Sequence, residues 1–122
     1  MIIEILSQEF AVCKVKNLKE VNFNEIFTFL SKTDEELSLV CPIESVPENS
    51  LEVEKDWRAF RIKGVLDFSL IGILSKISGI LSDNGIGIFV ISTFNTDYVL
   101  VKKNSLDKAK LKLSENGYKF IN

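Results

Sequence analysis

The hydrophobic period changes repeatedly in the second half of the sequence, and this constrains the fold more than any other feature. Apolar residues alternate at first, then recur every three or four residues, and then alternate again. Alternation is typical of a β-strand, and a spacing of three and four is typical of one helix face. The successive segments are 59–66, 70–81, 86–93, 97–103, 106–115 and 118–121. The resulting order, β-α-β-β-α-β within about 60 residues, predicts an α+β fold of the ferredoxin-like type.

Both helical segments carry sequence signals at their ends. Asp67 or Ser69 is predicted to cap the start of the first helix, because short polar side chains accept hydrogen bonds from its free N–H groups. Residues 84–85 and 116–117 are both Asn-Gly. They are predicted to end the two helices, because glycine readily adopts the left-handed conformation.

The strand predicted at 86–93 is apolar on both faces. Ile88 and Val90 lie on one face, and Phe89 and Ile91 lie on the other. Neither face can be left in water, and the helices of this fold cover only one. The second face needs a cover from the first half of the chain, from a second copy, or from both. The sequence therefore predicts a homodimer.

The first half of the chain is predicted to form a subdomain at residues 1–58, followed by the main domain at 59–122. Its expected strands are 2–6, 10–15, 27–31 and 36–42. The first two are predicted to form a hairpin that turns at 7–9.

An internal repeat appears when the sequence is shifted along itself by half its length, 61 of its 122 residues. The shift places "LSKTDEELSLV" over "ISTFNTDYVLV". The matched pairs are Ser31 and Ser92, Glu36 and Asp97, Leu39 and Leu100, and Val40 and Val101. Their position in each half indicates two related subdomains, with a chance match between short strands as the alternative.

The composition excludes several classes of function. The chain has 122 residues, 46% hydrophobic and 26% charged, which fits one globular domain or two small ones. It has no histidine and only two cysteines, Cys13 and Cys41. Without histidine it lacks the commonest general base, and it has no plausible zinc ligand set. We therefore expect no catalytic residues, no metal and no cofactor, so the protein is not expected to be an enzyme.

Charge and hydropathy bear on partners and location. Residues 1–56 carry twelve acids against five lysines, a balance of −7, and residues 57–122 carry five acids against ten bases, a balance of +5. The basic residues are scattered lysines without an RNA-reading aromatic motif, so nucleic-acid binding is not expected. No apolar run approaches the ~18 residues that span a bilayer, and the N-terminus lacks the pattern of a secretion signal. We expect a cytoplasmic protein with no membrane contact.

The stretch "GVLDFSLIGILSKISGILSDNGIGIFVISTFNTDYVLV" resembles an ACT domain, a small ligand-binding module. The subtype that it resembles is the CASTOR-type ACT domain. Residues 29–40 match an upstream segment of that subtype, and the second matching segment contains Ser92, Thr93, Phe94, Thr96, Asp97, Tyr98, Leu100 and Val101. The resemblance implies a regulatory protein that binds a free amino acid at a domain or subunit interface, with an ACT-like subdomain at 1–58 and an ACT domain at 59–122. A regulated protein partner is a further expectation.

A receptor for an amino acid needs N–H donors for the carboxylate and an acceptor for the ammonium group. The loop 67–72 leads into a helix N-terminus, which supplies free N–H groups. Asp97 can pair with the ammonium group, and Ser69 and Thr96 can add hydroxyl contacts. The expected ligand-binding residues are Asp67, Phe68, Ser69, Leu70, Ile71, Gly72, Ile86, Thr96 and Asp97.

Each of these residues has a structural alternative. Asp67 and Ser69 can serve only as helix caps, and Asp97 can serve only in a turn. Many ACT domains have Pro-Gly after the aspartate, whereas here the glycine is displaced to Gly72. This departure favours the alternative function, a dimeric protein–protein interaction module without a small-molecule ligand.

Overall fold

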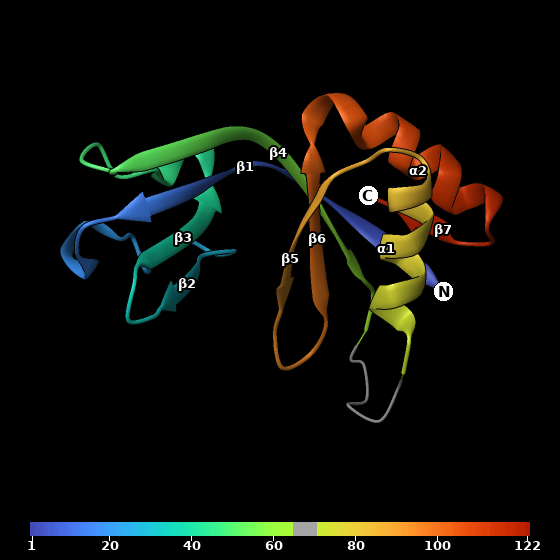
Figure 1. Cartoon of the computed structure of the whole chain (residues 1–122), viewed down its shortest axis with the longest axis horizontal. Helices are drawn as coiled ribbons and strands as arrows, with labels where there is room; N and C mark the ends of the chain where they lie inside the picture. Colours follow the sequence, from blue (N-terminus) through green and yellow to red (C-terminus); the bar gives the residue numbers. More distant parts are fainter. Residues whose placement is uncertain (65–70) are drawn as a thin grey trace. The chain divides into compact units, whose positions relative to one another are not determined.

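The computed structural model describes residues 1–64 and 71–122. The chain forms two compact units. Unit 1 consists of Met1–Ser7 together with Arg58–Asn122, and unit 2 is Gln8–Trp57. Strands β1 (Ile2–Val15) and β4 (Glu52–Ile62) are long enough to contribute residues to both units (Figure 1). Unit 2 ends at Trp57, and Met1–Ser7 belong to unit 1. The division into an ACT-like subdomain at 1–58 and an ACT domain at 59–122 stays a prediction.

Unit 1 contains the predicted β-α-β-β-α-β order. It runs from β4 through α1 (Ile73–Asp83), β5 (Ile88–Ser92), β6 (Asp97–Lys102) and α2 (Leu106–Glu115) to β7 (Lys119–Ile121). The strands lie in the order β5-β6-β4-β1, and β7 pairs with β1 in parallel. The α+β ferredoxin-like prediction is confirmed, with the start of β1 lying between β4 and β7.

The helices of unit 1 cover one face of its sheet. The buried stripe of α1 is Ile77 and Leu81, and α2 contributes Leu106, Ala109 and Leu113 to the same core. Alternate strand residues complete that core, namely Ile3, Ile5, Phe60, Ile62, Val99 and Val101. The two helices lie side by side (Figure 1). The sheet residues between these positions face the opposite side.

The sequence predicted the C-terminal ends of both helices correctly, but it did not predict the N-terminal cap of α1. Asn84 and Asn116 are the C-cap residues, and the glycines after them have φ of 71° and 91°. The prediction that Asp67 or Ser69 caps α1 is wrong. Both residues lie outside the described residues, and Gly72 occupies the cap position with φ 80°. The helix begins at Ile73 because this left-handed glycine sets its entry.

Unit 2 is built from strands and short 3₁₀ turns. Its strands are the second part of β1, β2 (Phe29–Lys32), β3 (Leu37–Pro42) and the first part of β4, in the order β2-β3-β1-β4. The 3₁₀ turns are η1 (Leu18–Glu20) and η2 (Ile43–Ser45). Every residue of Gln8–Trp57 is described, and this range contains no α-helix.

The predicted hairpin at residues 7–9 is wrong, because β1 continues through Ser7, Gln8 and Glu9 as a single strand. A tight hairpin turn needs residues that accept positive φ, and these three positions contain no Gly or Asn. The strand can therefore extend from one unit into the other.

The β2-β3 and β5-β6 hairpins repeat each other with an offset of 60 residues, one fewer than the sequence match indicated. Thr33 N–H donates to Glu36 C=O at 2.9 Å, and Thr93 N–H donates to Thr96 C=O at 2.9 Å. The strand registers Phe29↔Val40 and Phe89↔Leu100 show the same offset. A 3₁₀ turn follows each hairpin, η2 after β3 and η3 (Lys103–Ser105) after β6. The repeat therefore includes a hairpin and the turn after it.

Candidate ligand-binding site

The N-terminus of α1 carries backbone N–H groups that the helix itself leaves without an acceptor. Gly72 is the cap residue, and within residues 1–64 and 71–122 no side chain accepts a hydrogen bond there. Its carbonyl accepts the first helical bond, from Lys76 N–H at 2.9 Å. The N–H groups of the first turn have no acceptor within a helix, and the helix dipole adds partial positive charge. This end of α1 therefore suits a carboxylate.

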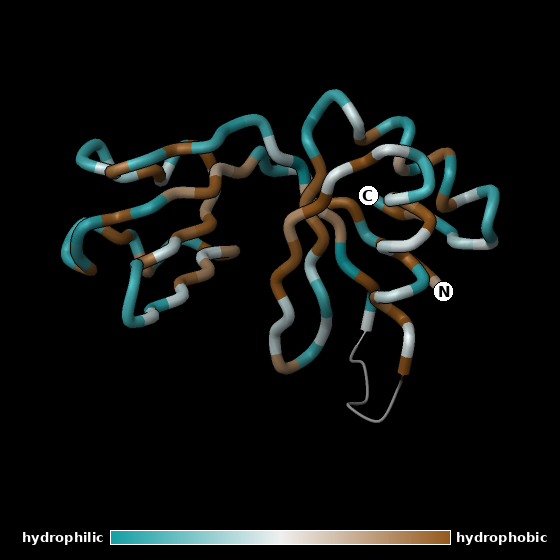
Figure 2. Tube along the Cα trace, in the orientation of Figure 1, coloured by the Kyte–Doolittle hydropathy of each residue, from teal (hydrophilic) through white to brown (hydrophobic). Residues whose placement is uncertain are grey.

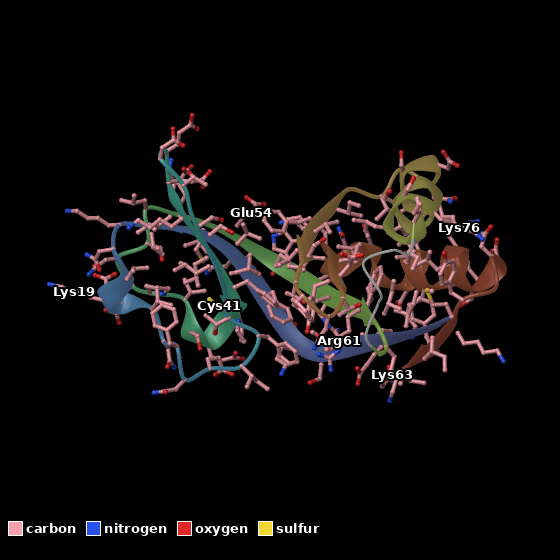
Figure 3. All side chains as sticks on the ribbon, turned by 90° about the horizontal axis from the view of Figure 1, so that it is seen from below. Lys19, Cys41, Glu54, Arg61, Lys63 and Lys76 are labelled. Atoms are coloured by element: carbon pink, nitrogen blue, oxygen red, sulfur yellow. The ribbon has the colours of Figure 1, made fainter. Side chains whose placement is uncertain are left out.

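A hollow of about 310 Å³ lies between the start of α1 and the end of α2. Its lining residues come from these two helix ends, the start of β1 and the approach to β7. They are Met1, Ile71, Gly72, Ile73, Lys76, Asn116, Gly117 and Tyr118. Lys76 is labelled in Figure 3 on α1.

The hollow has donors at one end and acceptors at the other. The C-terminus of α2 carries partial negative charge from its last carbonyl groups. Asn116 donates through Nδ2 to Lys112 C=O at 2.8 Å, which leaves its Oδ1 as a further acceptor. Burial raises the pKa of Tyr118, so its phenol is neutral at physiological pH. A zwitterion therefore matches the two ends, its carboxylate at α1 and its ammonium group at α2.

The predicted ligand-binding residues fall into separate places. Asp67, Phe68, Ser69 and Leu70 lie outside the described residues. Ile71, which is 94% exposed, and Gly72 both line the hollow. Ile86 belongs to the core of unit 1 and is 6% exposed, and its N–H donates to Leu81 C=O at 2.9 Å.

Asp97 is the first residue of β6 and Thr96 directly precedes it, and neither residue lines this hollow. Thr96 is buried, and its hydroxyl donates to Ile62 C=O at 3.1 Å, which ties the hairpin to β4. Asp97 accepts a hydrogen bond from the Ser92 hydroxyl on the neighbouring strand. The polar stretch of the β5-β6 hairpin thus has internal partners. That Thr96 and Asp97 share one ligand site with the α1 N-terminus stays a prediction.

A charged cluster on the helix-free face of unit 1 was missed by the sequence reasoning. Arg61 Nε lies 3.0 Å from Glu4 Oε1, and Arg61 donates to the Tyr98 hydroxyl at 3.0 Å. Its guanidinium lies 5.7 Å from the centre of the Tyr98 ring. Burial alone would lower the Arg61 pKa, but the bonds to Tyr98 and Glu4 hold it above its ordinary value. The alternation of β4 places Arg61 on this face, whereas its partners depend on the strand order.

The two cysteines lie in the core of unit 2. Cys13 on β1 and Cys41 on β3 are both buried free thiols. Hydrogen bonding between the thiols, followed by burial, raises the pKa of Cys41. The part of the chain that the structure describes contains no group of His, Cys, Asp or Glu side chains able to hold a metal ion. In the same part, no helix is both long and apolar enough to cross a membrane.

Residues 52–115 match the family model of the ACT domain, which covers more than half of the 122 residues. A protein of known structure from Agobacterium tumefaciens is 31% identical, with 98% of this chain and 91% of that chain covered and a TM-score of 0.87. A Vibrio cholerae protein of unknown function is 20% identical, with 98% of this chain and 88% of that chain covered and a TM-score of 0.76. Aspartate kinase from Clostridium acetobutylicum is 15% identical, with 88% of this chain and 32% of that chain covered and a TM-score of 0.64. No curated protein matches the sequence. The chain belongs to the ACT domain family.

Proposed function

We propose that the protein is a non-catalytic regulatory or sensor protein that binds a free amino acid through its ACT domain and acts as a homodimer in the cytoplasm. The family and the fold support a regulatory ACT protein. The structurally similar aspartate kinase from Clostridium acetobutylicum is described as an allosteric enzyme. The CASTOR-type assignment is part of the proposal and rests on the segments 29–40 and 92–101.

The hollow between the ends of α1 and α2 is the observation that carries this proposal. Its 310 Å³ is ample for a small zwitterion and its immediate solvent. The α1 N–H groups would hold the carboxylate, and Asn116 Oδ1 and the α2 carbonyls would hold the ammonium group. Asp67 to Leu70 adjoin Ile71 in sequence and are proposed to complete the contacts. Such a ligand would regulate by preferring one of two arrangements of the protein.

A thermal-shift screen over the twenty amino acids tests the proposal. A ligand present at 100 times its Kd stabilises a protein by about 2.7 kcal/mol, which raises Tm by several degrees. One amino acid or a small group should produce this shift. An absence of any shift at millimolar concentration would reject the amino-acid-binding function.

The chain supplies a matched pair of variants that locates the site. Asn116 and Asn84 are both C-cap residues whose Nδ2 donates to the carbonyl four residues earlier, at 2.8 Å in each case. Only Asn116 lines the hollow. Asn116→Ala should weaken binding of the amino acid about tenfold, the value of one hydrogen bond to a charged group. Asn84→Ala should lower Tm without changing affinity, and equal affinities in the two variants would place the ligand elsewhere.

The alternative function is a dimeric protein–protein interaction module that binds no small molecule. Two observations favour it. The glycine of the loop is displaced to Gly72, and the Ser92 and Thr96 hydroxyls of the β5-β6 hairpin have internal partners. The screen separates the two functions, because this module would show no selective shift with any amino acid.

A further inference from the structure

The hollow between the ends of α1 and α2 has a positive charge without a matching acid. Lys76 lines it, and within residues 1–64 and 71–122 no Asp or Glu side chain does so. Glu115, which directly precedes the lining residue Asn116, has its Oε1 3.7 Å from Lys112 Nζ and does not line the hollow. The partial positive charge of the α1 N-terminus adds to that of Lys76. The hollow therefore favours a ligand with net negative charge.

Lys76 is placed so that its ammonium group can reach the start of α1. It lies four residues after the cap residue Gly72, and its N–H donates to Gly72 C=O at 2.9 Å. Helical side chains lean toward the N-terminus of their helix, so the Lys76 side chain extends toward the first turn and its free N–H groups. Within the described part of the chain, the ammonium group has no hydrogen bond and no ion pair. A carboxylate bound in the hollow would supply the partner.

Tyr118 offers the hollow a second group, a hydroxyl that has no partner within residues 1–64 and 71–122. The residue is 9% exposed and belongs to the core of unit 1, and its backbone N–H donates to Leu113 C=O at 3.2 Å. The hydroxyl forms no hydrogen bond with any described group, and it is not fully enclosed by protein atoms. Buried hydroxyls normally have a hydrogen-bond partner. Because Tyr118 lines the hollow, its hydroxyl can donate to a carboxylate there.

The rest of the lining is mostly apolar. Its large apolar side chains are Met1, Ile71 and Ile73, and Figure 2 shows hydrophobic residues at the start of α1. Ile71 is 94% exposed, so a ligand would cover apolar surface that otherwise faces water. The methylene groups of a small ligand would pack there. Its charged groups would then bind the few polar groups of the lining.

We propose that the ligand of this hollow is an acidic amino acid, whose side-chain carboxylate binds Lys76 Nζ and the Tyr118 hydroxyl. The inference rests on the proposed function and names the class of amino acid that the site takes. The α1 N–H groups bind the α-carboxylate, and Asn116 Oδ1 and the α2 carbonyl groups bind the ammonium group. At neutral pH an acidic amino acid carries one more negative charge than positive, which balances Lys76. A basic amino acid would place a second cation beside Lys76 and is disfavoured.

Isothermal titration calorimetry of the full chain with L-aspartate, L-glutamate, L-asparagine, L-glutamine and L-lysine tests this inference. Each amide has nearly the shape of its acid and lacks the negative charge. One of the two acids should bind at least about tenfold more tightly than its own amide, because hydrogen bonds between charged groups are stronger than those to a neutral group. L-lysine should bind more weakly than that acid.

Three variants locate the side-chain carboxylate. Lys76→Met keeps most of the side-chain length and should weaken binding of the acid about tenfold or more, with little effect on the amide. Tyr118→Phe removes only a hydroxyl without a partner, so it should leave Tm unchanged and weaken binding of the acid about tenfold. Lys108→Met is the matched control, because Lys108 is exposed on α2 and does not line the hollow. It should leave both affinities unchanged.

Charge reversal at the same position gives a stricter test. Lys76→Glu should bind L-lysine more tightly than the acid, and circular dichroism should show that it is folded, because residue 76 is exposed. An unmodified chain that binds a neutral or basic amino acid more tightly than both acids would overturn this inference and leave amino-acid binding standing. A Lys76→Met variant with undiminished preference for acid over amide would do the same. A chain that binds no amino acid would overturn both the inference and the proposed function.

Discussion

The buried hydroxyl of Thr96 allows a direct test of whether the β5-β6 hairpin is held by structure or serves a ligand. Thr96 is 7% exposed, and its hydroxyl donates to the C=O of Ile62, a residue that is 3% exposed. Thr96→Val keeps the shape of the side chain and removes the donor. Because water does not readily reach this carbonyl, the loss should cost about 1–3 kcal/mol of unfolding free energy. For a chain of this length that corresponds to a decrease in Tm of about 4 °C per kcal/mol.

Urea and thermal unfolding followed by circular dichroism would measure this loss. Thr93→Val is the matched control, because Thr93 is exposed and its hydroxyl donates to Thr96 C=O at 3.0 Å in a turn that water can reach. Its cost should be below about 1 kcal/mol. A Thr96→Val variant that unfolds like the unmodified protein yet no longer responds to an amino acid would refute the structural role and assign the hydroxyl to the ligand.

The remaining predictions concern glycine conformation, the charged cluster and the thiols. An added Cβ would meet no atom within 4 Å at either Gly117 or Gly79, so backbone conformation decides the effect of alanine at each position. Gly117 has φ 91°, and Gly117→Ala should lower the free energy of unfolding by about 1–2 kcal/mol in urea titrations. Gly79 is helical, and Gly79→Ala should raise the free energy of unfolding by up to about 1 kcal/mol. Arg61→Met removes the bonds to Glu4 and Tyr98 and should cost about 1–2 kcal/mol in the same assay. An unchanged urea midpoint would contradict a stabilising role. Cys13 and Cys41 are buried, so Ellman's reagent should label neither thiol in native protein at neutral pH and both in urea, and rapid labelling of the native protein would contradict this packing.

The sequence predicted the elements of unit 1 because each has a local signal. The buried positions Ile77 and Leu81 follow from helical periodicity, and the two Asn-Gly pairs end α1 and α2 as expected. The cap of α1 was wrong for a local reason as well. Polar residues at 67 and 69 carry the usual cap signal, but a glycine in the left-handed conformation three residues after Ser69 sets the start of the helix.

The sequence predicted only the part of the candidate site that one continuous segment of the chain supplies. The α1 N-terminus, with Gly72, could be read from the sequence. Asn116 and Tyr118 line the same hollow only because the end of α2 lies near the start of α1, and no local pattern reports that proximity. Ile86 was expected to contact the ligand because it begins the segment after α1, but its side chain packs into the core of unit 1.

The amino-acid sequence by itself determined the types and order of the strands and α-helices from β4 to β7, because hydrophobic period and the two Asn-Gly pairs are local properties. It also indicated a repeat, although hydrogen bonding in the two hairpins was needed to set the offset at 60 residues. The tertiary structure decided that β1 is one strand whose first residues lie between β4 and β7, and that Arg61 reaches both Glu4 and Tyr98. Strand order depends on contacts between residues far apart in the chain, and neither periodicity nor capping encodes those contacts.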